Sequence, residues 1–234
     1  KMIKEVDTVI TVSNSIAEDY KRMYGIIKPF LVMNCPNYKI YKKGDLFRKE
    51  FNLGQEKIIF LFQGEYLKGR GVEELIKVFK ELEDINKDLV LILLVYGKGV
   101  EELKGNIEKS SNIFWHDKVS KDVYMEYVAS ADWGIYLMEI ICKNHEYVLP
   151  NKLFDYVMAN LSVVVSNLKE MKKFVEENKI GYTVDSTDRE KVLELLKSMK
   201  IEDRKIINKE LGQTARKYSW EEQEKVLLKI YNSL

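Results

Sequence analysis

Short, uniformly apolar segments that alternate with amphipathic segments constrain the fold of this chain more than any other feature. Strands that are apolar on both faces are buried on both faces, which is typical of a parallel sheet between layers of helices. We therefore predict an α/β fold with a Rossmann-like, doubly wound parallel sheet. The predicted strands are Ile58–Phe62, Leu89–Val95, Ile113–Trp115, Trp133–Leu137 and Ser162–Val165, with a weaker one at Gly181–Val184.

The predicted helices lie between these strands. The first runs from Val72 to Leu82, where apolar residues keep the i, i+3, i+4, i+7 spacing of one buried face. The stretch from Tyr38 to Lys57 is charged and weakly periodic, which predicts a surface connection. The remaining predicted helices are Lys121–Ser130, Asn151–Ala159, Leu168–Glu177 and Arg189–Ser198. The last stretch, residues 202–234, is predicted to be helical and amphipathic.

The amino-terminal residues predict a separate strand and helix. Thr8–Val12 is β-branched, and Ser15 and Glu18 have the spacing of a capping box at a helix start. We predict that residues 1–30 are a strand–helix unit between domains or the remnant of an N-terminal domain. Residues 31–218 are then a Rossmann-like domain, and residues 219–234 a C-terminal helix. The chain opens at Lys1, so we expect a piece of a longer protein.

Charge and cysteine content exclude several classes of partner. The 38 basic and 37 acidic side chains give a formal net charge of +1, so no overall field favours nucleic acid. Cys35 and Cys142 stand in no zinc-binding spacing, and no metal site is predicted. Few cysteines and no apolar run of membrane-spanning length predict a cytoplasmic protein. Peripheral docking at a membrane stays open.

Ligands of open parallel sheets bind beyond the carboxyl ends of the strands, so the loops there are the candidate sites. The first, Gln63–Gly71, holds three glycines and two cations, which predicts contact with a phosphate. A simple glycine-rich turn is the alternative. Gly64 and Gly69 have P-loop spacing, but Arg70 and Gly71 follow where lysine and a hydroxyl residue should stand. A P-loop is therefore disfavoured.

Two further loops give weaker signals. Gly97 and Gly99 form a G-x-G after the second strand, which indicates either close ligand approach or a tight turn. His116 follows the third strand without a serine or cysteine partner that the sequence places beside it. We interpret it as a partly exposed loop histidine and not as a catalytic base.

The fourth loop leads through Pro150 into a helix, and it is the most informative. Lys152 lies in the first turn of that helix, where a cation opposes the helix dipole. A bound anion at the same helix start explains this placement. Asp155 lies one turn further, where its carboxylate can accept hydrogen bonds from sugar hydroxyls. The alternative is a surface lysine beside an acidic residue that favours the dipole.

These segments, in this order, resemble the family 4 glycosyltransferases of the two-domain GT-B type. Pro150–Ala159 with Ser162–Ser166 is similar to that family's P-x-K-L-x-E-Y-M-A segment before G-x-P-V-V. The resemblance covers nearly the whole chain and implies the C-terminal, nucleotide-sugar-binding half of a GT-B fold. Other matching segments are Val6–Ser13, Gly64–Ile76, Leu94–Gly99 and Tyr218–Trp220.

The resemblance also implies roles for individual residues. Arg70 and Lys152 neutralise the donor diphosphate as the catalytic residues. Gly64 lets the backbone come close to the diphosphate. Glu65 occupies the place of a second phosphate-binding arginine of the family, and Lys68 compensates for its absence. Asp155 replaces the family's ribose-binding glutamate. Further implied donor contacts are Gly97, the base-gripping Asp117, Lys118 and Val119, Glu146 at the donor sugar, and Pro150, Asn151 and Leu153 at the helix start.

Two departures from the family pattern concern this region. Glu146 is nine residues before Asp155, where the family's paired-glutamate spacing is eight, so the spacing on which the donor-sugar contact depends is not met here. Asn160 and Ser162 replace a glycine and a proline. Asparagine tolerates the left-handed conformation, so we expect the helix to end there nevertheless.

The implied reaction transfers a hexose-like group from a nucleotide-sugar donor to an acceptor hydroxyl, with retained configuration and with no metal or other cofactor. The implied partners are a saccharide or lipid-linked acceptor and the missing N-terminal domain of the same protein, which carries most of the acceptor site. Surface-polysaccharide or glycolipid synthesis is the expected pathway. The alternatives are a non-catalytic α/β interaction domain and a P-loop-like nucleotide-binding protein.

Overall fold

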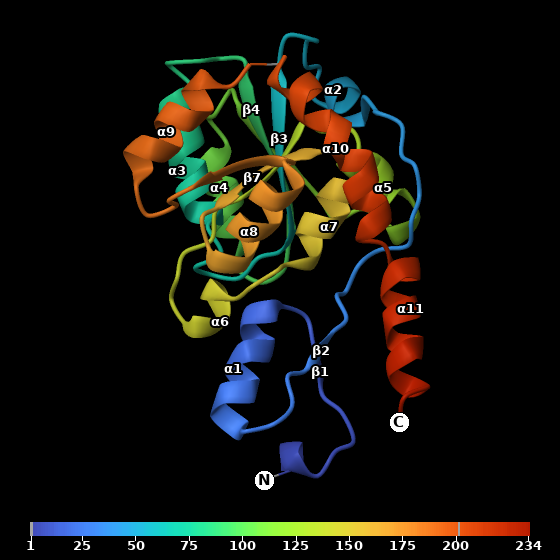
Figure 1. The fold of residues 1–234 in the computed structure, drawn as a ribbon. Helices are drawn as coiled ribbons and strands as arrows, with labels where there is room; N and C mark the ends of the chain where they lie inside the picture. Colours follow the sequence, from blue (N-terminus) through green and yellow to red (C-terminus); the bar gives the residue numbers. More distant parts are fainter. Residues whose placement is uncertain (1, 201) are drawn as a thin grey trace.

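The computed structural model describes residues 2–200 and 202–234. Within them, six parallel strands form one sheet in the order β5-β4-β3-β6-β7-β8 (Figure 1). The predicted doubly wound α/β fold is confirmed. The strands are β3 (Ile58–Glu65), β4 (Leu89–Tyr96), β5 (Ile113–His116), β6 (Trp133–Tyr136), β7 (Ser162–Ser166) and β8 (Gly181–Val184).

Helices cover both faces of this sheet. Helices α3 (Val72–Leu82) and α9 (Arg189–Ser198) pack against each other on one side (Figure 1). On the other side, α7 (Asn151–Met158) contacts both α5 (Lys121–Val128) and α10 (Asp203–Lys217). Helix α8 (Lys169–Asn178) connects β7 to β8. Asn160 has a φ of 61°, so the helix end expected at this asparagine is confirmed.

Close packing fixes α7 against the centre of the sheet. A Cβ atom on Gly134 of β6 would lie 2.3 Å from the Tyr156 ring, so only glycine leaves room for that ring. The Tyr156 hydroxyl donates a hydrogen bond to the Leu61 carbonyl of β3 at 2.9 Å. Because Tyr156 is fully buried, these contacts set the height at which α7 begins relative to the sheet edge.

The sheet has a topological switch point between β3 and β6. From β3 the chain proceeds to β4 and β5 in one direction, and from β6 to β7 and β8 in the other. Loops that leave the carboxyl ends of β3 and β6 therefore diverge to opposite faces and leave a crevice between them.

The charged stretch after residue 38 is not only a surface connection, and this prediction was wrong in part. It contains α2 (Leu46–Glu50), which places Phe47 and Arg48 in the interior. The Arg48 guanidinium donates to the buried Asp132 carboxylate at 2.7 Å. A buried charge needs such a partner. The helix could not be predicted from hydrophobic periodicity, because many of the surrounding residues are lysines. Helices α4 (Val100–Ile107) and α6 (Lys143–Glu146) were also not predicted.

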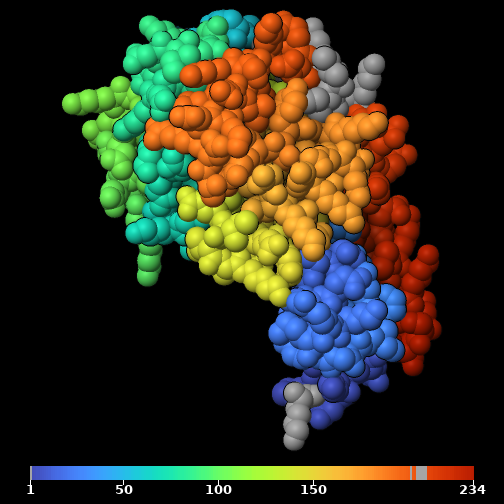
Figure 2. Space-filling view, turned by 60° about the vertical axis from the view of Figure 1, so that its left-hand side comes forward, coloured from blue at the N-terminus to red at the C-terminus, as the bar shows by residue number. Residues whose placement is uncertain are grey.

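The amino-terminal unit is a short parallel pair, β1 (Ile10–Thr11) and β2 (Phe30–Leu31), joined by α1 (Asn14–Tyr24), after a 3-10 turn at Met2–Lys4. The predicted capping box is wrong, because α1 begins at Asn14 with Ser13 as its N-cap. The unit projects from the body of the molecule beside the final helix, α11 (Trp220–Tyr231) (Figure 2).

Candidate functional site

A cavity of about 440 Å³ lies at the switch point, between the segments that follow β3 and β6. It contains six of the predicted site residues, which are Gly64, Arg70, Pro150, Asn151, Lys152 and Asp155. The structure adds Gln63, Glu65, Tyr96, Tyr124, Tyr136, Met138, Asn144, His145, Val148 and Leu149 to the lining.

Gly71 holds Arg70 at the cavity. Gly71 is the N-cap of α3 and has a φ of 86°, in the left-handed region that favours glycine. A Cβ atom there would lie 1.6 Å from the Leu137 carbonyl oxygen, so α3 begins directly against the end of β6. This contact draws the loop after β3 to the segment after β6. The Arg70 guanidinium has no ion-pair or hydrogen-bond partner among the described residues and faces the cavity.

Lys152 extends from the start of α7, whose N-cap is Pro150, toward the end of β3. Its ammonium lies 4.2 Å from the ring centroids of both Phe62 and Tyr136. A Cβ atom on Gly64 would be 3.5 Å from the same nitrogen, so the glycine leaves the approach to the ammonium open. The rings offset part of the cost of burying this cation, by about 2 kcal/mol for a desolvated contact.

The electrostatic state of Lys152 is that of a cation without its counter-ion. Burial, together with the neighbouring Arg70 guanidinium, lowers the pKa of Lys152 to about 7, while Asp155 acts in the opposite direction. Within the described part of the chain, its ammonium has no hydrogen-bond or ion-pair partner. Two adjacent cations that lack anionic partners are arranged to receive an anion, and the anion would restore the charge of the lysine.

Asp155 lies one turn along α7 and shares the cavity. The Tyr124 hydroxyl of α5 donates to Asp155 Oδ2 at 2.9 Å. Burial raises the pKa of Asp155 to about 6, against the lowering effects of the Tyr124 hydrogen bond and of Lys152. One carboxylate oxygen is thus held by the tyrosine, and the other is available to hydroxyl groups of a ligand.

Gln63 is a further polar group at this site. It is the residue before Gly64 on β3, and it is fully buried. Neither atom of its side-chain amide has a hydrogen-bond partner among the described residues. Buried amides are usually paired, so an unpaired one beside an open cavity is typical of a site that is completed by a ligand.

The other predicted site residues do not line the cavity. Lys68 is exposed, and Leu153 is buried in the core. Glu146 is half-buried in α6, and its neighbours Asn144 and His145 line the cavity in its place. Of the remaining four residues, Gly97 follows the cavity-lining Tyr96, and the Lys118 ammonium lies 4.5 Å from the centroid of that ring. The Asp117 carboxylate pairs with Lys104 at 3.2 Å, and Val119 packs against the core.

His116 is not the exposed loop residue that we predicted. It is the last residue of β5 and is buried, with its ring edge-on to Phe47 and Tyr127. Its Nε2 lies 3.0 Å from the Glu50 carboxylate. The ring is therefore part of the packing between β5, α2 and α5, and it does not line the cavity.

Sequence reasoning missed the tyrosines of the site. Tyr124 lies within an amphipathic helix, where its spacing is that of a core residue. Tyr136 ends an apolar strand, and Tyr96 ends another. All three stand at or near the carboxyl edge, and aromatic residues at that edge were the available signal.

The arrangement suits the binding of an anion that also carries hydroxyl groups. The cavity is lined by two cations, Arg70 and Lys152, and by a carboxylate that a tyrosine holds, Asp155 with Tyr124. No group of three or more His, Cys, Asp or Glu side chains suitable for a metal ion is found among the described residues. None of the described helices combines the length and apolarity that crossing a bilayer requires.

Comparison with known proteins identifies the family. The sequence model of the family described as Glycosyl transferases group 1 matches residues 44–218, which include the whole cavity. The chain belongs to this family. A search of curated protein sequences finds no match.

Solved structures of similar fold support the GT-B assignment of this group 1 glycosyltransferase chain. Sucrose-phosphate synthase from Thermosynechococcus elongatus superposes with a TM-score of 0.77 at 15% identity, over 97% of this chain and 58% of the synthase. HepE from Anabaena, solved in complex with UDP-glucose, gives 0.76 at 12% identity, over 98% and 64%. TarM gives 0.72 at 15% identity, over 98% and 43%. The chain thus spans less than two thirds of each of these proteins.

Proposed function

We propose that this chain binds the nucleoside diphosphate sugar of a family 4 glycosyltransferase, as the C-terminal domain of the GT-B fold. The observation that carries the proposal is the pair of cations, Arg70 and Lys152, which face one cavity without partners among the described residues. Gly64 opens the approach to them. The diphosphate of the donor supplies the missing negative charge.

The other polar and aromatic residues of the cavity fit the nucleoside. Asp155 accepts hydrogen bonds from the ribose hydroxyls through the oxygen that Tyr124 leaves available. Tyr96, with Lys118 over its ring, lies toward the rim and offers an aromatic surface near the nucleobase. The HepE structure holds UDP-glucose, so a UDP-sugar is the first donor to test.

Arg70 and Lys152 then act on the chemical step by electrostatics. As the bond between sugar and diphosphate breaks, negative charge grows on the leaving phosphate, and the two cations stabilise it without having to move. One such preorganised group contributes roughly 3 kcal/mol, or about a hundredfold in rate. The stereochemical outcome proposed from the family resemblance is retention, and the proposed chemistry requires no bound metal.

The acceptor is a hydroxyl of a saccharide or of a lipid-linked saccharide, and the pathway is surface-polysaccharide or glycolipid synthesis. We place most of the acceptor site on an N-terminal domain that contacts the amino-terminal unit. The proposed location is the cytoplasm, at or near the membrane where such acceptors are held.

Thermal-shift measurements with UDP, GDP, ADP and CDP, each with and without Mg²⁺, test donor binding. A ligand at 100 times its dissociation constant stabilises the fold by about 2.7 kcal/mol, which gives a readily measured rise in Tm. We expect a rise with one diphosphate that does not depend on Mg²⁺. Lys152→Ala and Arg70→Ala should abolish it.

Lys68→Ala is the matched control, because it removes an exposed cation of the same loop that does not line the cavity. It should leave the shift unchanged. A shift seen only with ADP and Mg²⁺ contradicts the proposal in favour of a P-loop-like protein. No shift with any nucleotide contradicts it in favour of a non-catalytic interaction domain.

A further inference from the structure

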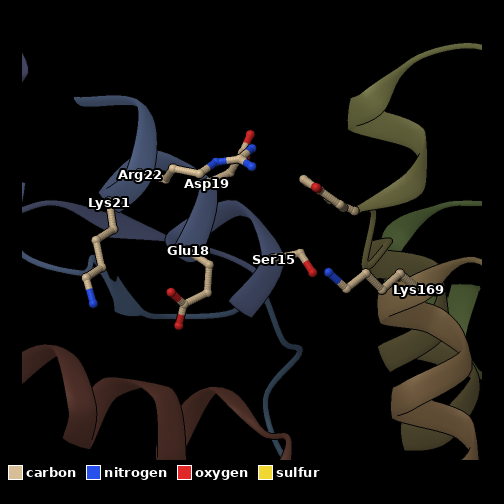
Figure 3. A pocket seen from close by; sticks show the side chains of 7 residues that line it. Ser15, Glu18, Asp19, Lys21, Arg22 and Lys169 are labelled. Carbon is tan, nitrogen blue, oxygen red and sulfur yellow. The ribbon is translucent and has the colours of Figure 1, made fainter. Parts of the chain in front are cut away.

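The segment Cys142–Pro150 forms one wall of the cavity and has a second face turned away from it. Several of its side chains line the cavity, among them His145 and Leu149. On the other face, a separate hollow of about 440 Å³ lies between Tyr147 of this segment, helix α1 and Lys169 of α8. Figure 3 shows Asp19 and Arg22 extending from α1 into this gap.

Helix α1 contacts the wall through its N-cap residue and through a side chain on its second turn. The Lys143 ammonium pairs with Asp19 Oδ2 at 2.7 Å, and the Asp19 side chain is only 11% exposed. Ser13, the N-cap of α1, donates from its hydroxyl to the Tyr147 carbonyl at 3.0 Å. These two contacts hold both ends of α6.

The first part of the wall has little support of its own. Helix α6 is a single turn of four residues, too short to be stable by itself. Residues 139–144 are all exposed. By contrast, α1 is anchored on the main body, because the Ser15 amide donates to the buried Glu170 carboxylate of α8 at 2.6 Å. Helix α1 thus adds a second attachment to the body, beside the direct contacts of Val148 and Leu149 with the core and of the Lys169 ammonium of α8, which lies 5.3 Å from the Tyr147 ring centroid.

We propose that Asp19 is a positioning residue for donor binding, which acts by holding Lys143 and with it the cavity wall. This inference rests on the proposed function. The amino-terminal unit then affects the affinity of the donor cavity although none of its residues lines that cavity. Any movement of α1 relative to α8 is transmitted to His145 and Leu149 through the Lys143 and Tyr147 contacts.

The test compares Asp19→Asn with two controls on the same helix. Glu18→Gln breaks the exposed pair with Lys28, and Arg22→Gln removes the other partner of Asp19 while it keeps Lys143. We expect Asp19→Asn to raise the Kd of UDP-glucose about fivefold by calorimetry, in the range of ordinary coupling between sites. Both controls should change it less than twofold.

Hydrogen exchange of the amides of residues 142–150 gives the second readout, with and without ligand. Asp19→Asn should speed exchange there and leave the sheet amides unchanged. Asp19→Glu, and the exchange of charges in Asp19→Lys with Lys143→Asp, should restore both Kd and protection. A Kd in Asp19→Asn equal to that of the native chain overturns the inference, and so does a loss of affinity that the charge exchange leaves unrepaired.

The two proposals fail separately. If the native chain binds no nucleotide, the proposed function fails, and the exchange comparison alone decides whether Asp19 holds the wall. If the native chain binds and Asp19→Asn binds equally well, only the role of Asp19 is refuted.

Discussion

The charge state of Lys152 makes donor affinity depend on pH near neutrality. In the empty cavity, burial and Arg70 lower the pKa of Lys152 to about 7. A bound diphosphate places negative charge beside the ammonium and raises that pKa again. The donor therefore binds the protonated form more tightly, and above pH 7 binding is accompanied by uptake of a proton.

The magnitude follows from the pKa. With a value of about 7, half of the empty sites carry a protonated Lys152 at pH 7 and about 3% do so at pH 8.5. Affinity should fall by about 15-fold over this range, or about 1.6 kcal/mol. On the acid side, Asp155 has a pKa of about 6, so its loss of charge removes the acceptor for ribose hydroxyls. Affinity should thus be highest between pH 6 and 7.

Calorimetry with UDP-glucose from pH 5 to 8.5 measures this profile, and titrations in two buffers of different ionisation enthalpy count the protons taken up. Lys152→Arg keeps its charge throughout, because arginine does not deprotonate in proteins. This variant should lose the alkaline decline and keep the acid one. A native Kd that is constant between pH 7 and 8.5, or an unchanged decline in Lys152→Arg, refutes the reasoning.

Three further substitutions test the surroundings of the cavity. Gly71→Ala should destabilise the fold by more than about 2 kcal/mol in urea titrations, because its Cβ would overlap a backbone carbonyl at a φ of 86°. A Cβ atom on Gly105 of α4 would have no other atom within 4 Å, so Gly105→Ala should stabilise the fold by about 0.5–1 kcal/mol. A loss of stability in this variant would contradict the prediction. Tyr124→Phe removes the hydrogen bond that lowers the pKa of Asp155, so the acid decline should move toward neutral pH and donor affinity should fall roughly tenfold. If the decline of affinity at acid pH is unchanged in this variant, Tyr124 does not affect the pKa of Asp155.

Much of the fold could be predicted because the large sheet is apolar on both faces. The strands are buried along their length, so each appears in the sequence as an uninterrupted run. Helix α2 was missed because only Phe47 and Arg48 point inward among charged neighbours. A buried arginine is recognised only when its partner is known, and Asp132 is far away in sequence.

The candidate site could be predicted in part for a related reason. Arg70 stands in a glycine-rich loop, and Lys152 opposes the dipole of its helix, so the sequence alone indicates both. Asp155 was predicted from its place one turn after Lys152 and from the family resemblance. Tyr124 reaches Asp155 only because α5 crosses beside α7, and that pairing is a consequence of packing. Glu146 does not line the cavity, whereas Asn144 and His145 do. The available signal was the spacing of nine residues between Glu146 and Asp155, where the family has eight.

The isolated pair of β1 and β2 has a practical consequence for handling this protein. Within the described residues each strand has one neighbour only, so the outer backbone edge of each strand remains unpaired. Ile10, Val12 and Phe30 lie exposed along the same ribbon. Such an edge is a template on which a further strand from another molecule can add. We expect reversible, concentration-dependent self-association in solution, which charged substitutions at these three positions should suppress without affecting the cavity.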